Sequence, residues 1–260
     1  MVVCKSPAEI EKMLGANELV ADILETLAAM VAPGVTTADL DAEAEKLARA
    51  AGAAPAFKNY RGYPATLCTS INDQVVHGIP SAKSVLRDGD IVSIDMGVKM
   101  HGFYGDSAVT VPVGRVSEST TRLLEVTKAS LEAGIAAVGV DGRVSDIGHA
   151  VQAYVEARGF SVVREFVGHG IGAALHEEPQ VPNYGERGRG TRLRVGMVLA
   201  IEPMVNMGRP EVKVLRDGWT AVTKDGSLSA HFEHTVAVTA DGPRILTVPR
   251  SRRGVTQAAL

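Results

Sequence analysis

LRDGDIVSID, which spans residues 86–95, recurs 107 positions later as LRVGMVLAIE, residues 193–202. Each copy is an apolar, strand-type run that ends on an acid, Asp95 in the first copy and Glu202 in the second. A carboxylate at the end of an apolar strand is costly to bury unless a cation lies against it. The repeat therefore predicts a metal site where two related parts of the chain meet.

The repeat extends beyond these strands. Identical residues recur at the same offset of 107 positions in further pairs, which include Glu18 and Glu125, Asp39 and Asp146, and Gly52 and Gly159. Helical spacing of apolar residues predicts helix pairs at 9–30 with 37–51 and at 117–138 with 144–158, each followed by a strand-rich tract. A duplication that now serves only folding is the plain alternative.

This pattern predicts an α+β fold made of two ααββ halves, about 5–113 and 114–250. We expect a pseudo-twofold axis to relate the halves and a curved, mostly antiparallel sheet to join them. The tail 250–260 is rich in arginine and lacks apolar periodicity, so we expect it to be flexible. The segment 183–194 is rich in Gly and Arg and is interpreted as a solvated loop.

Composition narrows the class of protein. The chain has 260 residues, 27.3 kDa and 45% hydrophobic residues, which suits one large domain. A net charge of -3 gives no reason to expect DNA or membrane binding. Only Cys4 and Cys68 occur, which favours a reducing compartment such as the cytoplasm. The sequence has neither an 18-residue apolar run nor a secretory signal pattern.

Three more residues can join the two strand-end acids. Asp106 follows the first acid after a short hairpin, His169 lies in the tract GHGIG, and Glu233 lies within the apolar run AHFEHTVAVTA. Taken alone, each has an ordinary alternative, because Asp is common in turns and His in cores or on surfaces. We interpret His231 and His234 as structural.

The charge of this set indicates the number of metal ions. Four carboxylates carry four negative charges, which two divalent cations balance and one does not. Oxygen-rich ligands favour Co, Mn, Fe(II) or similar ions. Two such ions can activate water for amide hydrolysis. The sequence has no GxSxG motif, and Cys68 has no cationic neighbours in sequence, so we expect no nucleophilic side chain.

Five motifs occur in an order that resembles the type I methionine aminopeptidases of the pita-bread fold. They are SIDMG (93–97), GDSAVT (105–110), FVGHGIG (166–172), IEPM (201–204) and EHTVAVT (233–239). The resemblance covers about residues 5–250. It implies a single catalytic domain, residues 1–260, and a two-metal centre whose ligands are Asp95, Asp106, His169, Glu202 and Glu233. It also implies that Glu202 acts as the general base.

The resemblance further implies a substrate pocket. His77 and His176 would contact the substrate and act in catalysis, with His176 stabilising charge at the scissile amide. Tyr60, Tyr63, Cys68 and Trp219 would surround the methionine side chain, although core aromatics are the plain alternative. Phe57 and Leu175 occupy pocket positions where the family pattern has Cys and Phe.

The expected function is removal of the initiator methionine from nascent polypeptides whose second residue is small. An X-Pro aminopeptidase or prolidase of the same fold is one alternative, and a catalytically inactive peptide-binding scaffold is another. We expect a cytoplasmic monomer that binds the N-terminal methionine of its substrates. A transient contact with the ribosome is compatible with this function.

Overall fold

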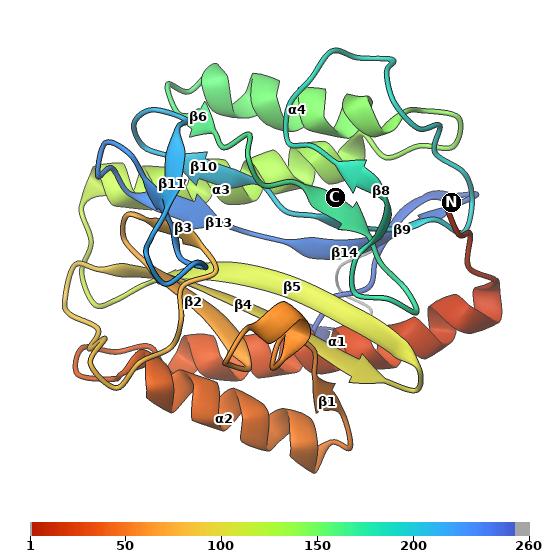
Figure 1. Ribbon diagram of the computed structural model, residues 1–260. Helices are drawn as coiled ribbons and strands as arrows, with labels where there is room; N and C mark the ends of the chain where they lie inside the picture. Colours follow the sequence, from red (N-terminus) through yellow and green to blue (C-terminus); the bar gives the residue numbers. More distant parts are fainter. Residues whose placement is uncertain (1, 253–260) are drawn as a thin grey trace.

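Two helical layers enclose the strands in the computed structural model, which describes residues 2–252 (Figure 1). Helices α1 (Pro7–Met30) and α2 (Thr37–Ala50) lie on one side. Helices α3 (Glu118–Ala136) and α4 (Val144–Glu156) lie on the other. Both expected helix pairs are therefore present, within a few residues of the expected bounds.

The first two helices begin where their sequences provide capping boxes. Ser6 Oγ accepts a hydrogen bond from Glu9 N at 3.3 Å, and the Glu9 carboxylate accepts one from Ser6 N at 2.8 Å. Thr36 and Asp39 make the same reciprocal pair at the start of α2. These bonds satisfy backbone N–H groups that have no partner inside the helix, and so fix where each helix starts.

A long hairpin dominates the first half. The strands of this half are β1 (Ala54–Pro55), β2 (Leu67–Ile71), β3 (Gln74–Val76), β4 (Ile91–Met100) and β5 (Phe103–Pro112). Strands β4 and β5 pair along their whole length, with Asp95 opposite Ala108 and Gly97 opposite Asp106. Because residues two apart in a paired strand share a face, this register puts Asp95 and Asp106 on the same face.

The second half contains more and shorter strands. They are β6 (Ser161–Val162), β7 (Gly168–Gly170), β8 (Glu177–Val181), β9 (Val198–Ile201), β10 (Met204–Asn206), β11 (Val212–Val214), β12 (Ala221–Thr223), β13 (Ser229–His231), β14 (His234–Thr239) and β15 (Gly242–Ile245). Five of them form a sheet in the order β15-β14-β9-β7-β8. Every strand pairing among the described residues is antiparallel. The mixture of helices with antiparallel strands confirms the α+β class.

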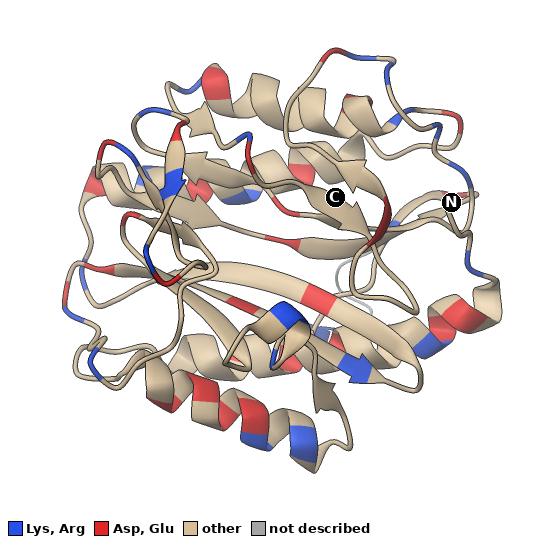
Figure 2. Ribbon diagram, viewed as in Figure 1, with Lys and Arg blue, Asp and Glu red and all other residues tan. Residues whose placement is uncertain are grey.

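Each half has its own core, and the halves meet between β5 and β14. Leu24 and Leu40 of the first helix pair are buried with Ile94 of β4, whereas Leu131 of α3 is buried with Ile201 of β9. At the junction, an isolated bridge joins Ala108 to Glu233, and Glu233 N donates to Ala108 O at 2.9 Å. Figure 2 shows acidic segments interrupting the strands in this central region. The junction thus brings residues from both halves together.

The last described residues lie against the first helix. A short 3-10 helix, η2 (Arg250–Arg252), follows β15, and Arg250 Nε lies 3.4 Å from Asp22 Oδ2. The first residues of the expected flexible tail are therefore hydrogen-bonded to α1, and residues 253–260 of that tail lie outside the described residues. No helix of the described chain is long and apolar enough to cross a membrane.

Candidate metal centre and adjoining cavity

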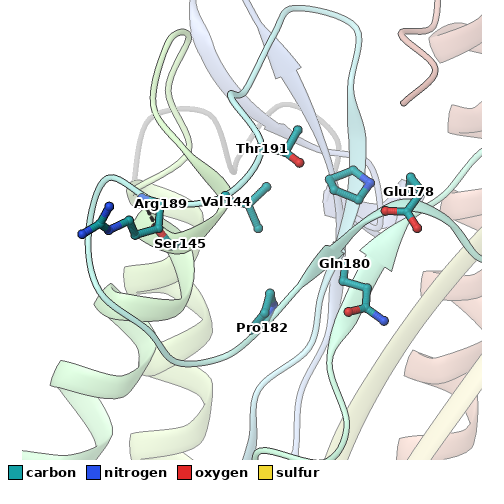
Figure 3. Close-up of a pocket in the computed structure, with 9 residues that line it drawn as sticks. Val144, Ser145, Glu178, Gln180, Pro182, Arg189 and Thr191 are labelled. Carbon is teal, nitrogen blue, oxygen red and sulfur yellow. Dashed lines mark hydrogen bonds between the residues drawn. The ribbon is translucent and has the colours of Figure 1, made fainter. Parts of the chain in front are cut away.

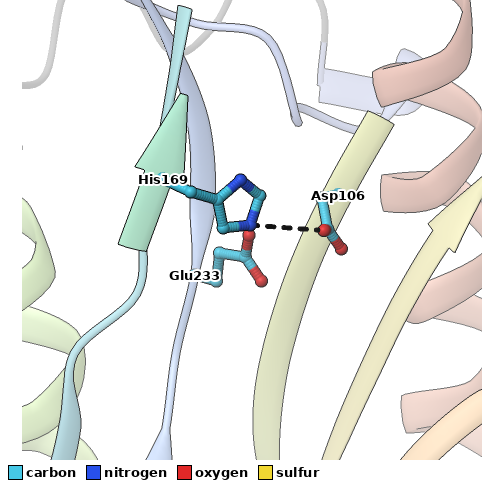
Figure 4. A group of neighbouring side chains, drawn as sticks. All are labelled: Asp106, His169 and Glu233. Carbon is cyan, nitrogen blue, oxygen red and sulfur yellow. Dashed lines mark ion pairs between the residues drawn. The ribbon is translucent and has the colours of Figure 1, made fainter. Parts of the chain in front are cut away.

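Three buried side chains converge at the junction of the halves. Asp106 comes from β5, His169 from β7, and Glu233 from the position before β14, and Figure 4 shows them facing one another. Their possible ligand atoms all lie within 4.8 Å of one another. The three residues are 4%, 7% and 3% exposed. One small ion can therefore contact all three.

The two strand-end acids border the same site. Asp95 and Glu202 line a cavity of about 190 Å³ together with Asp106, His169 and Glu233. Glu202 Oε1 lies 3.6 Å from His169 Nε2. Asn183 Nδ2 donates to the Glu202 carbonyl oxygen at 3.0 Å and so fixes the backbone that carries this acid. The structure brings all five expected ligand residues to one cavity.

The acids have no protein cation to balance them. Among the described residues, no Lys or Arg forms an ion pair with any of the four carboxylates. Burial raises the pKa of Asp95 to about 7. Burial first, and neighbouring carboxylates second, raise the pKa of Asp106, Glu202 and Glu233 well above their usual range. Such a cluster is stable as carboxylates only with added positive charge.

Unsatisfied atoms point to the same conclusion. Asp95 Oδ1, Asp106 Oδ1 and Glu233 Oε1 are buried and have no hydrogen-bond partner. Buried polar atoms normally have partners, so orphans gathered in one place indicate a missing ligand. Carboxylate oxygens together with one imidazole nitrogen suit Co, Mn, Fe(II) and similar divalent ions. The residues present therefore fit a metal centre.

His169 is arranged to offer one nitrogen to this centre. Its Nδ1 lies 2.9 Å from the Gly170 carbonyl oxygen, and an N–H there donates to that carbonyl. The neutral ring then has its lone pair on Nε2, which faces Asp106 and Glu202. Burial first, and His176 second, lower the pKa of His169 to about 4. The imidazole is therefore neutral at neutral pH, as metal binding requires.

Two further histidines line the cavity. His176 Nδ1 lies 2.8 Å from the Tyr60 hydroxyl, and its ring centroid is 4.3 Å from that of His169. His77 contacts Phe166 and Trp219 edge-on, with centroid distances of 5.4 and 6.4 Å. Burial lowers the pKa of both histidines, to about 4 for His77. Both rings are thus neutral groups beside the acidic cluster.

The remaining expected pocket residues form the apolar wall. Tyr60, Tyr63, Cys68, Trp219, Phe57 and Leu175 all line the same cavity. The Tyr63 hydroxyl lies 2.9 Å from the carbonyl oxygens of Leu67 and Gly78, so this residue presents its ring to the cavity. Burial first, and Asp95 second, raise the pKa of the Cys68 thiol well above its usual range. Cys68 is therefore a neutral wall residue.

Two neighbours of the cavity were not expected from the sequence. Arg61 lines it from the 3-10 helix η1 (Tyr60–Gly62), where its backbone is left-handed with φ 50°. Phe166 packs against His77. The motif FVGHGIG contains Phe166, and this motif is the only sequence signal for it. For Arg61 we find no sequence signal, because its position depends on the local backbone turn.

A second cavity of about 530 Å³ lies beside α4 and the segment 183–194 (Figure 3). Arg189 N donates to Ser145 Oγ at 2.7 Å, and Gly188 N donates to Asp146 Oδ1 at 2.8 Å. The Arg189 side chain itself is 76% exposed. Residues 186–190 of the segment are exposed, as expected, whereas Asn183 and Leu193 near its ends are buried, and its backbone is hydrogen-bonded to the start of α4. This cavity lacks the cluster of buried ionisable groups found in the smaller one.

Comparison with known proteins agrees with this geometry. Residues 11–240 match the profile of a family described as "Metallopeptidase family M24". The chain belongs to metallopeptidase family M24. Within the family, it is 52% identical to the "Methionine aminopeptidase" of Clostridium perfringens, covering 95% of this chain and 99% of that one. It is 51% identical to "Methionine aminopeptidase 1" of Bacillus subtilis, with the same coverage.

Solved structures of M24 proteins share the fold. The methionine aminopeptidase of Thermotoga maritima superposes with a TM-score of 0.94 at 47% identity, covering 95% of this chain and 99% of that chain. A prolidase of Pyrococcus horikoshii superposes with a TM-score of 0.78 at 23% identity, covering 96% of this chain and 64% of that chain, which shows the fold alone. The expected pita-bread fold and the resemblance to methionine aminopeptidases are confirmed.

Proposed function

We propose that this M24 protein is a methionine aminopeptidase that removes the initiator methionine from nascent proteins with a small second residue. The observation that carries the proposal is the cluster of Asp106, His169 and Glu233 at an enclosed, aromatic-walled cavity. Near-full-length relatives named methionine aminopeptidase support it. A cavity of about 190 Å³ suits one unbranched side chain better than an extended peptide.

The five acidic and imidazole residues are assigned to hold two divalent ions such as Co, Mn or Fe(II). They are Asp95, Asp106, His169, Glu202 and Glu233. Orphaned carboxylate oxygens support the assignment, and the four negative charges balance two such ions. When bound, these ions supply Lewis-acid polarisation of the scissile amide and activation of water. Asp106 and Glu233, which come from different halves, would hold the ions where the two halves meet.

Glu202 is assigned the role of general base. Its side chain is 14% exposed where it borders the cavity, so the carboxylate can reach both substrate and water. A carboxylate whose pKa is raised can accept a proton from the attacking water and pass it to the departing amine. Its backbone, held by Asn183, limits how far the carboxylate moves during this transfer.

His176 is assigned to stabilise charge that develops on the scissile carbonyl oxygen. The Tyr60 hydroxyl donates to Nδ1 in the tautomer that carries hydrogen on Nε2. Nε2 then points a donor into the cavity, where it can meet the growing negative charge. His77, neutral and held between Phe166 and Trp219, is assigned to hydrogen-bond the substrate backbone.

The aromatic wall is assigned to the methionine side chain. Thioether sulfur makes favourable contacts with ring edges, which Tyr63 and Trp219 offer in a T-shaped pair at 5.1 Å. Phe57 and Leu175 add apolar surface without hydrogen-bonding groups. A proline substrate would gain nothing from sulfur contacts, which favours this reading over the X-Pro peptidases.

The test is release of free methionine by protein stripped of metal and refilled separately with Co, Mn, Fe(II) or Zn. We expect release from Met-Ala-Ser and Met-Pro peptides, little release when the second residue is bulky, and none after Asp106→Ala. An Ala-Pro peptide is the control for X-Pro activity. Cleavage of Ala-Pro alone overturns the proposal in favour of an X-Pro peptidase, and absence of turnover with every metal indicates an inactive scaffold.

Several broader features belong to the same proposal. We propose that the chain is a single catalytic domain, acts as a monomer and contacts the ribosome only transiently. A reducing compartment such as the cytoplasm is supported by Cys4 and Cys68, which are both free thiols. Sedimentation of the purified chain, alone and with ribosomes, tests the assembly and contact claims.

A further inference from the structure

His231 ends β13 with its imidazole buried beside Glu202. The ring is 2% exposed, and its Nε2 lies 3.8 Å from Glu202 Oε2. The other oxygen of the same carboxylate, Oε1, lies 3.6 Å from His169 Nε2. Glu202 thus lies between two imidazoles, each of which faces a different oxygen. From the sequence alone, His231 is interpreted as structural.

Two observations set His231 apart from an ordinary core histidine. Its Nε2 is buried and has no hydrogen-bond partner. Its backbone is held on both sides by Thr110, since His231 N donates to Thr110 Oγ1 at 2.8 Å and Thr110 Oγ1 donates to His231 O at 2.7 Å. An imidazole on a fixed backbone, with one unpaired nitrogen aimed at an acid, is suited to hold that acid in place.

His231 does not itself line the cavity, so it reaches the chemistry only through its neighbour. We propose that His231 is a positioning residue for Glu202, donating a hydrogen bond from Nε2 to Oε2 when the metal centre is filled. A distance of 3.8 Å exceeds a hydrogen bond, and a shift of about 1 Å by the carboxylate closes it. With Oε2 held, Oε1 keeps its direction toward His169.

The inference rests on the proposed function, because it assumes that Glu202 belongs to the metal centre. Carboxylates at metal sites are commonly oriented by hydrogen bonds from residues behind them, and loss of such a partner lowers metal affinity or activity about 10–100-fold. The clearest test therefore measures metal affinity without substrate, and turnover separately.

We would titrate Co(II) into metal-free protein by calorimetry for the parent, His231→Leu, His231→Asn and His231→Gln. Leu fills the space without a donor, Asn is too short to reach Glu202, and Gln supplies an N–H at similar reach. We expect Leu and Asn to weaken Co(II) binding or to lower kcat about 10–100-fold, and Gln to stay within about threefold of the parent. The control is His234→Gln, because His234 Nδ1 pairs with Thr247 Oγ1 at 2.8 Å instead.

Each outcome supports or contradicts the role proposed for His231. Leu and Asn variants that match the parent in both Co(II) affinity and kcat overturn the proposal and leave His231 as packing. A Gln variant that loses as much as Leu overturns it in another way, since the imidazole would then itself bind metal. If the parent releases no methionine but the affinity series holds, the proposed function fails while the role of His231 stands.

Discussion

The hydroxyl of Thr235 donates a 2.7 Å hydrogen bond to the carbonyl oxygen of Asp106, 129 positions earlier in the chain. A matching bond runs the other way, from the Ser107 hydroxyl to the carbonyl oxygen of Glu233 at 2.6 Å. Two of the five candidate ligands, Asp106 and Glu233, thus have their backbones held by hydroxyls of residues close in sequence to the other ligand of the pair. The geometry of the metal centre therefore depends on this reciprocal pair as well as on the ligands.

Removal of one hydroxyl tests this dependence. Thr235→Val keeps the shape of the side chain but leaves the buried Asp106 carbonyl without this donor. We expect the free energy of unfolding of the metal-free protein to fall by about 1–3 kcal/mol, measured by urea denaturation. Thr26→Val is the matched control, because its hydroxyl donates to Asp22 O on an exposed helix face. Equal effects of the two substitutions would argue against a special role for Thr235.

A second prediction concerns the tie between the N-terminal segment and the turn that carries His176. Lys5 Nζ lies 2.6 Å from Glu177 Oε2, with side chains only 4% and 12% exposed. Lys5→Met leaves the largely buried Glu177 carboxylate without its cation, with a hydrogen bond from Ala174 N remaining, and so costs up to about 3–5 kcal/mol of stability. Because Glu177 is next to His176, we also expect kcat to fall more than KM changes, as read from steady-state kinetics.

The control for Lys5→Met removes another ion pair with the same nitrogen–oxygen distance. Arg244 Nη1 also lies 2.6 Å from Glu11 Oε1, but those side chains are 36% and 59% exposed. Arg244→Met should cost less than about 1 kcal/mol and leave kcat unchanged. A Lys5→Met variant as stable and active as Arg244→Met would show that burial of the first pair has no consequence for the active site.

Buried histidines and buried acids have opposite effects on how the stability of the protein changes with pH. The histidines with lowered pKa, such as His77 near 4, make stability rise with pH up to their usual value of 6.5 and add nothing above it. The acids with raised pKa make stability fall as pH rises. The folded metal-free protein holds protons on Asp106, Glu202 and Glu233 that the unfolded chain has released, so stability falls as pH rises toward their folded pKa.

Above pH 7 the histidines no longer contribute to the slope. The acids set it, joined by the Cys68 thiol at the upper end of the range. We expect the free energy of unfolding of metal-free protein to fall between about pH 7 and 8.5, by up to about 1.4 kcal/mol per pH unit for each proton held. Saturating Mn(II) should abolish or reverse this slope, since the cation replaces the protons. Urea denaturation at four pH values, with and without chelator, measures both. A flat profile in the metal-free protein would contradict the raised pKa values.

Tyr60 provides a prediction about catalysis. Its hydroxyl fixes the tautomer of His176 through the 2.8 Å contact with Nδ1. Tyr60→Phe keeps the ring in the pocket but lets the imidazole adopt the wrong tautomer, so we expect kcat to fall about 2–10-fold with little change in KM. Tyr154→Phe, where the ring packs under Arg158 on the surface, is the control. A rise in KM with unchanged kcat would assign Tyr60 to binding alone.

The internal repeat predicts the two helix pairs and the strand-rich tract that follows each, because apolar periodicity is a local signal. The cost of burying a carboxylate predicts that Asp95 and Glu202, as candidate ligands, border one site. The motif resemblance supplied His77, His176 and the pocket wall. The position of Arg61 at the cavity could not be predicted from the sequence, because a left-handed backbone at a non-glycine residue has no reliable sequence signal. The hydrogen bonds of the Ser107 and Thr235 hydroxyls could not be predicted either. The carbonyl to which each hydroxyl donates belongs to a strand far away in the sequence.

His231 illustrates a different limit. Its neighbours in sequence, Phe232 and Glu233, indicated a strand but not what faces the ring. The orientation depends on pairing with β10, where His231 lies opposite Met204, two residues beyond Glu202. A single sequence does not predict this strand register. His231, which lies beside the proposed base Glu202, is therefore indistinguishable in the sequence from an ordinary core histidine.

The origin of the ligands in both halves has a consequence for synthesis of the protein itself. Asp95 and Asp106 leave the ribosome well before Glu202 and Glu233, which belong to the last quarter of the chain. A growing fragment therefore carries the negative charges of Asp95 and Asp106 without the full set of metal ligands. Under the proposed ligand assignment, capture of the full metal complement and the onset of activity must wait until Glu233 has been translated, so shorter fragments cannot act on other newborn chains.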